Sequence, residues 1–441
     1  MRPRTLLAPA LAVLLAGSAL PLLAPGPALA AGPTPAPAPA PATAPAAAQP
    51  ERTALWLPRP TGPFLTGTTL LHLRDRDRVD PLDPEQRRRE LRVQVFYPAA
   101  STGGRPLAPY APPGEVAALQ AFYPVPKGAF TVQTHSRLQA PVRAGTHKVV
   151  FFHHGLCASR TDTTAVNEQL ASQGFVVVAL ASTHESPAVE FPGGRVEKTT
   201  DPEYCLAGGD PYSAKSQRVL KDLLAVRVAD TRYVLDQLIR LDRGANPDVA
   251  GAPLPPGIAG TLDTEQVGIY GHSFGGATAA AVMREDRRFV AGVNLDGLLV
   301  GPVERSGLDK PFLVMGSSYH SQASDPSWAS FLPRLSGWHR WFRVQGAGHY
   351  RFIDLGGSVR RWGLDETLKQ QDPETWRLVF GDIGDGVSSA IVRTTTAAFF
   401  DRFLRGRAQP LLSSPHAYFP QLQDRTDRID PAPRSGADSV G

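Results

Sequence analysis

Short runs of β-branched and aromatic residues alternate along this chain with longer stretches of helical periodicity. Apolar residues alternate with more polar ones over residues 91–97, which predicts an early strand that starts the sheet. Residues 147–152 read HKVVFF, a helix-like segment follows over residues 160–172, and residues 175–180 form another apolar run. This order predicts a strand, a helix and a second strand.

A long amphipathic helix is expected over residues 214–241, where apolar residues recur at helical spacing before Gly244 ends the pattern. An apolar strand at residues 267–270 is followed by a glycine-rich turn and an alanine-rich helix that ends near residue 284. Further strand-like runs and a last helix follow, at residues 289–295, 311–315, 340–344 and 390–404.

Strands that alternate with helices predict an α/β fold, with a mainly parallel, doubly wound sheet and helices on both faces. In such sheets, ligands bind beyond the carboxyl ends of the strands. Functional side chains are therefore expected directly after the predicted strands.

The first 30 residues read as an export signal, with Arg2 and Arg4 before an apolar Leu/Ala stretch and small residues at positions 28–30. A transmembrane anchor is the alternative, but prolines interrupt the stretch and no comparable apolar run of about 18 residues occurs later. We therefore expect a secreted protein whose signal peptide, residues 1–30, is cleaved near Ala30. No cysteine lies beside that position to carry a lipid anchor.

The rest of the chain is interpreted as one folded domain with two tails. Residues 31–50 consist almost entirely of Ala, Pro and Thr, which predicts a disordered spacer. Residues 51–410 form the expected catalytic domain, because single α/β domains reach this size when they carry insertions. Residues 411–441 form a C-terminal extension that is expected to be partly disordered.

Composition argues against several classes of partner. The formal net charge is +5, of which the expected signal contributes two charges, and no long basic run stands out beyond residues 87–89, so nucleic-acid binding is not expected. Cys157 and Cys205 are an even pair in an exported chain, which permits one disulfide; two unpaired thiols are the alternative. Because the chain also lacks a zinc-ligand cluster, a P-loop, a dinucleotide-binding glycine motif and an EF-hand loop, we expect no metal and no cofactor.

The sequence GHSFG at residues 271–275 lies between a predicted strand and a predicted helix. In that context a G-x-S-x-G pattern forms a nucleophile elbow. Glycines on both sides let the strand and the helix approach closely, so that Ser273 can occupy a strained turn and expose its Oγ. A chance Gly/Ser turn is the alternative, but the context predicts that Ser273 is a nucleophile.

A serine nucleophile needs a base, and in this fold the acid and the histidine follow the serine along the chain. Four histidines follow Ser273. Only His349 lies in a glycine-containing loop directly after a strand-like run, so we expect it to be the base. His320, His339 and His416 are interpreted as surface or core histidines.

The acid is usually an aspartate just after the strand that precedes the histidine strand. Here that strand ends in GSSY at residues 316–319, which contains no carboxylate. One strand earlier, Asp296 lies at a carboxyl end, where it could orient the imidazole through Nδ1 and stabilise the imidazolium. Asp296 is the expected acid, and Asp325, Asp309 and Asp354 remain alternatives.

An oxyanion needs fixed N–H donors, which in this fold come from the residue after the nucleophile and from the loop after an earlier strand. Phe274 is therefore the first expected donor. The backbone N–H of Leu156, in the sequence HHGL at residues 153–156, is the second. Two adjacent histidines are also found in metal sites, but no carboxylate or cysteine cluster accompanies them beyond Cys157.

These residues together resemble the plasma-type (isoform II) platelet-activating factor acetylhydrolase family, a group of lipid ester hydrolases with bacterial members. Four blocks carry the resemblance: VVFFHHGL at 149–156, GHSFGG at 271–276, NLDG at 294–297 and GHY at 348–350. The similarity spans residues 88–405 and implies the α/β-hydrolase fold. The family places its acid one strand early, which agrees with Asp296. Two departures are His153, where mammalian members carry a serine, and Cys157.

The resemblance implies calcium-independent hydrolysis of short or oxidised acyl chains from phospholipids, in a family that includes relatives acting on triacylglycerols or polyesters. We therefore expect a serine carboxylic-ester hydrolase that forms an acyl-enzyme on Ser273, acts on small-molecule or lipid esters and contacts lipid surfaces transiently. The apolar residues 298–300 beside the acid are expected to limit acyl length. A lipase, a polyester hydrolase, a peptidase with the same triad and an inactive lipid-binding module are the alternatives, and the complete triad argues against the last.

Overall fold

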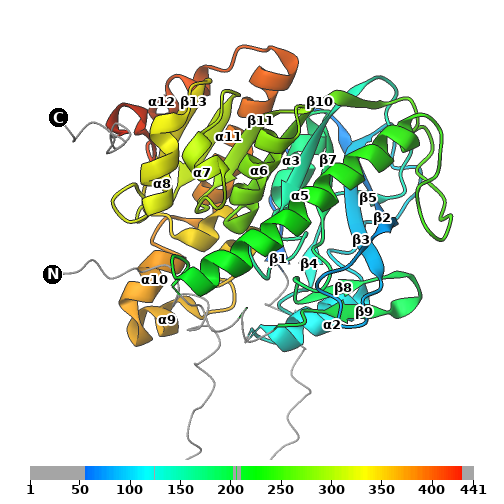
Figure 1. The fold of residues 1–441 in the computed structure, drawn as a ribbon, viewed down its shortest axis with the longest axis horizontal. Coiled ribbons are helices and arrows are strands. Elements are labelled where there is room, and N and C mark those ends of the chain that lie inside the picture. The colour runs from blue at the N-terminus through cyan, green and yellow to red at the C-terminus, as the bar shows by residue number, and fades with distance from the viewer. Residues whose placement is uncertain (1–54, 124, 202–204, 206–209, 430–441) are drawn as a thin grey trace, which may run out of the picture.

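A ten-stranded sheet runs through the protein and is covered by helices (Figure 1). The structure, a computed structural model, describes residues 55–123, 125–201, 205 and 210–429. The expected signal peptide and spacer lie outside these residues.

The strands of the large sheet share one order of pairing from edge to edge. In that order they are β14 (Leu422–Asp424), β13 (His339–Val344), β12 (Phe312–Gly316), β11 (Phe289–Leu295), β10 (Leu262–His272), β6 (His147–His153), β7 (Val176–Leu180), β3 (Arg88–Ala99), β2 (Leu65–Val79) and β5 (Arg137–Leu138). The run from β13 to β7 is parallel throughout, whereas β14, β3 and β2 pair with their inner neighbours in antiparallel fashion. This confirms the mainly parallel sheet.

Four helices cover the two faces of the sheet. α5 (Ala214–Asp242) and α6 (Phe274–Glu285) share one buried cluster with the strands, and α3 (Thr164–Ser172) and α11 (Asp385–Arg405) share the other. Helices on both faces confirm the doubly wound arrangement that the alternating pattern predicts.

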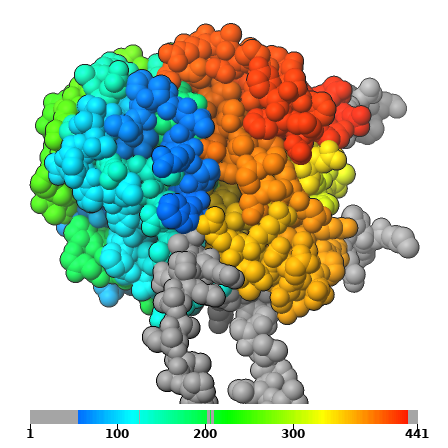
Figure 2. Space-filling model, turned by 180° about the vertical axis from the view of Figure 1, so that it is seen from behind, coloured from blue at the N-terminus to red at the C-terminus, as the bar shows by residue number. Residues whose placement is uncertain are grey.

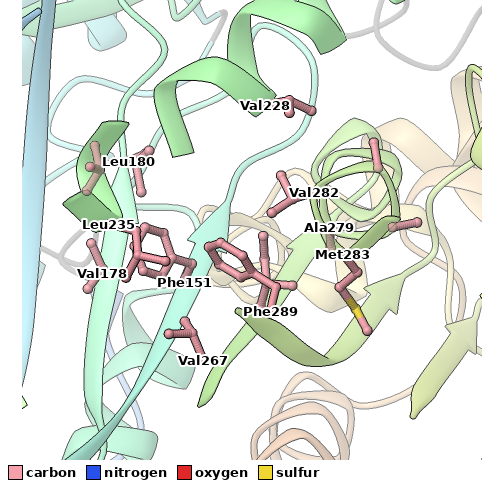
Figure 3. Packing of buried hydrophobic residues seen from close by; sticks show 14 of the residues in the cluster. Phe151, Val178, Leu180, Val228, Leu235, Val267, Ala279, Val282, Met283 and Phe289 are labelled. Atoms are coloured by element: carbon pink, nitrogen blue, oxygen red, sulfur yellow. The ribbon is translucent and has the colours of Figure 1, made fainter. Parts of the chain in front are cut away.

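The run HKVVFF shows why both faces must be covered. Successive side chains of a strand point to opposite faces, so Phe151 packs toward α5 and α6 while Phe152 packs toward α3 and α11, and both are fully buried. Figure 3 shows Phe151 beside Phe289, with ring centres 5.3 Å apart, below side chains of α5 and α6 such as Val228 and Val282. A strand that is apolar on both faces is stable only in the middle layer of such a fold.

The remaining elements lie in the connections between these layers. The short helices are α2 (Pro113–Phe122), α7 (Val303–Ser306), α8 (Pro326–Phe331), α9 (Asp365–Gln371), α10 (Pro373–Val379) and α12 (Pro415–Tyr418). The 3₁₀ turns are η1 (Pro192–Gly194), η2 (Leu332–Arg334), η3 (His349–Phe352), η4 (Asp354–Gly357), η5 (Pro410–Leu412) and η6 (Thr426–Arg428). Two small sheets pair β1 (Leu55–Trp56) with β4 (Val132–Gln133), and β8 (Ala188–Glu190) with β9 (Val196–Lys198).

Two features differ from the sequence-based expectation. β3 does not start the sheet, because β2 precedes it and pairs with it from Leu65 to Val79. The domain also continues past residue 410, where the extension was expected to begin, since β14 pairs with β13 and Leu422 is fully buried.

The start of the described chain lies against its C-terminal half. Figure 2 shows the first described segment, in blue, next to the orange residues of the last third of the chain. Arg393 of α11 donates a hydrogen bond to the carbonyl oxygen of Arg59 over 3.1 Å. No helix among the described residues combines the length and apolarity needed to cross a membrane.

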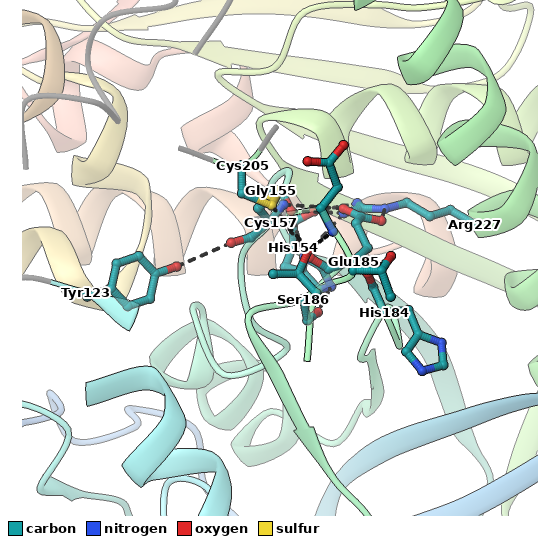
Figure 4. The surroundings of a disulfide bond; sticks show 12 residues. Tyr123, His154, Gly155, Cys157, His184, Glu185, Ser186, Cys205 and Arg227 are labelled. Atoms are coloured by element: carbon teal, nitrogen blue, oxygen red, sulfur yellow. Dashed lines mark hydrogen bonds and ion pairs between the residues drawn. A yellow bond between two sulfur atoms is a disulfide. The ribbon is translucent and has the colours of Figure 1, made fainter. Parts of the chain in front are cut away.

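A disulfide joins Cys157, in the loop after β6, to Cys205, in the connection that leads to α5 (Figure 4). The two Cα atoms are 5.5 Å apart, and the cysteines are separated by 48 positions in the sequence. Cys157 has a φ of 51°, in the left-handed region, so the cross-link lies beside a strained turn of this loop.

Removing this cross-link should destabilise the protein, because the unfolded chain gains the freedom of a long loop. For a loop of this size, the Cys157→Ala, Cys205→Ala double variant should lower the free energy of unfolding by about 4 kcal/mol. Urea unfolding followed by tryptophan fluorescence measures this change, with the oxidised parent as the control. An unchanged unfolding midpoint would contradict a structural role for the bond.

Candidate active site

Ser273 lies at the sharp turn between β10 and α6. Its φ is 55° and its ψ is −123°, a strained conformation for a residue with a side chain. The flanking glycines are required by close contacts: a Cβ on Gly271 would overlap the backbone of Gly275, and a Cβ on Gly275 would overlap the carbonyl oxygen of His153. The turn therefore has the geometry that GHSFG predicts.

The structure brings the five expected reaction residues to one cavity. Ser273, His349 and Asp296 line it together with the two expected oxyanion donors, Leu156 and Phe274. No hydrogen bond joins Ser273 to His349 in this part of the structure. Such contacts often tighten only when substrate binds, so the resting geometry is compatible with a nucleophile and its base.

Asp296 follows β11 and holds His349. Its Oδ2 lies 2.7 Å from His349 Nδ1, and its Oδ1 accepts a hydrogen bond from the Ser317 N–H over 2.6 Å. His320 Nδ1 lies 3.1 Å from the same Oδ1. Burial would raise the pKa of the Asp296 carboxyl, but His320 and His349 outweigh it and hold that pKa well below its usual range. The carboxylate is therefore ionised, which lets it orient the imidazole and stabilise an imidazolium.

The alternative acids do not contact His349. Asp309 is exposed, and Asp354 accepts a hydrogen bond from the Ala165 N–H on the α3 side. Asp325 caps α8 and lies 2.6 Å from His320 Nε2. Of the four candidate acids, only Asp296 contacts the imidazole of His349.

The other histidines after Ser273 have different places. His416 is exposed, and His339 contacts the carbonyl oxygen of Gly337 at the start of β13. His320 is a core histidine, but sequence reasoning missed that it contacts the acid. No local pattern marks that contact, because His320 and Asp296 are 24 residues apart.

The two expected oxyanion donors flank Ser273. Phe274 is the first residue of α6, where a helix leaves its N–H groups without internal partners. Leu156 belongs to the loop after β6, and the preceding Gly155 is so close that a Cβ there would lie 3.3 Å from the Ser273 Cβ. Within the described residues, no hydrogen bond occupies the N–H of either donor.

Arg227 of α5 fixes the peptide groups of this loop (Figure 4). Its side chain is 1% exposed and donates to the carbonyl oxygens of His154, over 2.6 Å, and Gly155, over 2.9 Å. Because the C=O and N–H of a trans peptide point in opposite directions, holding the Gly155 oxygen toward α5 directs the Leu156 N–H away from α5. The guanidinium also lies 4.7 Å from the ring centre of Phe274, so it supports both donors.

Glu185 completes this support. It accepts hydrogen bonds from Arg227, one of them over 2.9 Å to Oε2, and from the Cys157 N–H over 3.3 Å to Oε1. Sequence reasoning missed both residues. The available signal was a charged residue on the apolar face of the long helix, since Arg227 is buried beside Leu224 and Val228.

The adjacent histidines of the loop are structural. His153 Nε2 lies 2.8 Å from Thr231 Oγ1, and His154 Nδ1 lies 2.7 Å from the Gly155 oxygen. Burial first, and then the charge of Arg227, lower the pKa of both imidazoles well below the usual value, so both are neutral. Nowhere in the described residues do three or more His, Cys, Asp or Glu side chains gather as a metal site would require.

Apolar and aromatic side chains make up most of the cavity wall. They include Tyr110, Leu119, Tyr123, Phe130, Leu298 and Tyr350. Asp162 also lines the cavity, and burial raises the pKa of its carboxyl to about 7. An ester with an apolar acyl or alcohol portion fits a wall of this composition.

Comparison with known proteins identifies the family. The chain matches the family described as platelet-activating factor acetylhydrolase, isoform II, over residues 57–364. A probable 1-alkyl-2-acetylglycerophosphocholine esterase of Arthroderma benhamiae is 25% identical over 393 residues, which cover 83% of this chain and 92% of that protein. A platelet-activating factor acetylhydrolase of Cavia porcellus is 27% identical over 291 residues, or 62% of each chain.

A solved structure supports the same assignment. A ferulic acid esterase from Streptomyces cinnamoneus superposes with a TM-score of 0.69 and is 33% identical, over 84% of this chain and 99% of that one. The family match covers more than half of the chain and confirms the resemblance found in the sequence. The chain therefore belongs to the platelet-activating factor acetylhydrolase isoform II family, and it is a carboxylic ester hydrolase with the α/β-hydrolase fold.

Proposed function

We propose that this esterase acts through a covalent acyl-enzyme on Ser273. The observation that carries the proposal is the 2.7 Å contact between Asp296 and His349 in the cavity that also contains the strained Ser273. A serine is activated when a base takes its proton and an acid fixes the tautomer of that base. Here the Asp296 carboxylate accepts a hydrogen bond from the Nδ1–H of His349, which leaves Nε2 as the basic nitrogen.

The first half of the reaction forms the acyl-enzyme. Ser273 Oγ attacks the carbonyl carbon of the ester while His349 Nε2 takes the hydroxyl proton. The carbonyl oxygen becomes an oxyanion that accepts hydrogen bonds from the N–H groups of Leu156 and Phe274, a contribution of about 3 to 4 kcal/mol for one such donor in other enzymes. When the tetrahedral intermediate collapses, the bond to the alcohol breaks and His349 returns the proton to the leaving oxygen.

The second half releases the acid. Water gives a proton to His349 Nε2 and attacks the acyl carbon, and the same two N–H groups stabilise the second oxyanion. When this intermediate collapses, the bond between the acyl carbon and Ser273 Oγ breaks, His349 returns the proton to Ser273 Oγ, and the carboxylic acid leaves. His272 helps to hold His349 in place, because its Nε2 lies 3.0 Å from the His349 carbonyl oxygen. Burial, followed by the proximity of His349, lowers the pKa of His272 to about 3, so this neighbour is neutral and does not repel the imidazolium.

The proposed substrates are small-molecule or lipid esters with a short acyl group, in line with the names of the acetyl-ester relatives of Arthroderma benhamiae and Cavia porcellus. Leu298 lines the cavity just beyond the acid, whereas Leu299 and Val300 are fully buried in the core behind it. Of the apolar run that was expected to limit acyl length, only Leu298 therefore contacts the cavity. Aromatic side chains such as Tyr123 and Phe130 form another part of the wall.

A fluorophosphonate probe should label Ser273 and no other serine. The probe reacts with a serine only where a base activates it and an oxyanion site holds the phosphoryl oxygen. Peptide mapping by mass spectrometry locates the adduct, and Ser273→Ala, the matched control, should lose both labelling and ester turnover. An adduct on a different serine would refute the assignment.

The acyl-length profile should rise and then fall. Each CH₂ that fits is worth about 0.8 kcal/mol, whereas one that meets a packed wall costs about 1 to 3 kcal/mol. Aryl esters with acyl chains of about two to about sixteen carbons, assayed beside short-acyl and long-acyl phosphatidylcholines, show the limit as a drop in kcat/KM. If palmitoyl esters equal or exceed acetyl and butyryl esters, the enzyme is instead a lipase of the same fold.

A further inference from the structure

His320 connects the acid of the site to a second buried carboxylate. Its Nδ1 lies 3.1 Å from Asp296 Oδ1, and its Nε2 lies 2.6 Å from Asp325 Oδ2. The ring is stacked on Trp328, with centres 3.9 Å apart and planes 18° from parallel. The side chain is 2% exposed, so both nitrogens must find their partners inside the protein.

The surroundings of Asp325 require that it be ionised. Its Oδ1 accepts hydrogen bonds from the Ser327 N–H over 2.7 Å, the Ser327 hydroxyl over 2.6 Å, the Trp328 N–H over 3.2 Å and the Tyr212 hydroxyl over 2.6 Å. Only Oδ2 is left for His320. If this carboxyl were protonated, its O–H would face a hydrogen-bond donor at either oxygen, and one of these hydrogen bonds would be lost.

Both oxygens of Asp296 also accept hydrogen bonds. Ser317 donates to Oδ1, and the Nδ1–H of His349 points to Oδ2 when Nε2 is the base. Because both carboxylates are acceptors only, both nitrogens of His320 must donate. A neutral imidazole has one N–H, and only the imidazolium has two.

We propose that His320 is a positioning residue of the esterase reaction: a charged imidazolium that bridges Asp296 to Asp325, offsets part of the Asp296 charge, and keeps His349 available as a base at lower pH. This inference rests on the proposed roles of Ser273 and His349. It adds a residue whose effect on the reaction passes through Asp296.

The sign of the effect follows from the charges around His349. Asp296 is the anion in contact with it. In general an anion stabilises a neighbouring imidazolium, and a cation beside that anion weakens the stabilisation. Other titratable groups near it in the cavity are His272, which is neutral, Tyr350, whose pKa is raised by burial and by Asp162, and Asp162 itself, whose carboxyl has a pKa of about 7. Because Asp162 is present in the parent and in the variants alike, the difference between their pH profiles reports the charge of His320. Without the charge of His320, the acidic limb of the activity profile should therefore lie at a higher pH.

The electrostatics of His320 agree with this geometry. Burial alone would lower the pKa of its imidazole, but Asp296 and Asp325 outweigh burial and raise it to about 10. Since this is above the ordinary value of about 6.5, the stability contributed by the charge is present in full below about pH 6.5 and is lost as the pH rises toward 10.

The first test measures the proton count directly. In protein labelled with nitrogen-15 histidine, NMR should show both ring nitrogens of His320 protonated from about pH 6 to about pH 9. The resonance is assigned by its loss in His320→Asn. A neutral ring with one N–H, or titration with a midpoint near the ordinary value of about 6.5, would overturn the proposal without bearing on the role of Ser273.

The second test is the pH profile of kcat/KM. The variant His320→Asn removes the charge. Its amide N–H lies near the place of His320 Nδ1, so the variant keeps a hydrogen-bond donor to Asp296. In this variant, the acidic limb of the kcat/KM profile should lie about one pH unit higher than in the parent. At pH values below the limb, kcat/KM should fall by up to about tenfold, whereas its plateau value should be nearly unchanged. An unmoved limb, or one moved to lower pH, would contradict the inference.

A matched control is His184, which also lies between two carboxylates. Its Nδ1 is 3.0 Å from Asp80 and its Nε2 is 3.3 Å from Glu197, but it does not line the cavity. His184→Asn should leave the acidic limb where it is.

If His320→Asn does not fold, His320→Gln, which retains a donor toward Asp325, takes its place. If the parent protein is not labelled by the fluorophosphonate at Ser273, the proposed function itself is rejected, which distinguishes its failure from that of the His320 proposal.

Discussion

The proposed active site depends first on one buried negative charge, the carboxylate of Asp296. A charge in the protein interior is stable only when hydrogen bonds and opposite charges replace the lost water. Ser317, His320 and His349 meet this requirement, and the same contacts fix the imidazole of the proposed base, His349. The need to satisfy one carboxylate therefore also sets the geometry of the proposed reaction.

The turn that carries Asp296 is held from both sides. Asp296 has a φ of 56°, and the side chain of Asn294 bridges the turn by donating to the Gly297 oxygen over 2.7 Å and accepting from its N–H over 2.8 Å. A Cβ on Gly276 would overlap Asn294, so this turn packs directly against α6, the helix that follows Ser273. The parallel sheet makes this possible, because the ends of β6, β10 and β11 meet at one edge.

Local patterns predicted the parts of the site that are local in the chain. The elbow is visible because GHSFG must form a tight turn, and Asp296 because the usual position of the acid has no carboxylate. The bridge through His320 to Asp325 and the support of the oxyanion loop by Arg227 were not predictable, since each joins segments that only the folded sheet brings together. β2 and β14 were missed for a related reason, because both lie toward the sheet edges, where pairing rather than a strong apolar pattern defines the strand.

The most direct test of the role of Asp296 is the kcat of Asp296→Asn on a soluble aryl ester. The amide keeps the shape of the side chain but presents a donor to His349, which favours the wrong tautomer. In another Ser-His-Asp triad the same change lowers kcat about 10⁴-fold, and a loss of that order is predicted here. Asp309→Asn, at the exposed alternative acid, is the control and should retain the parent kcat. A loss of less than about tenfold in Asp296→Asn would contradict the account, because His349 would then not need this carboxylate.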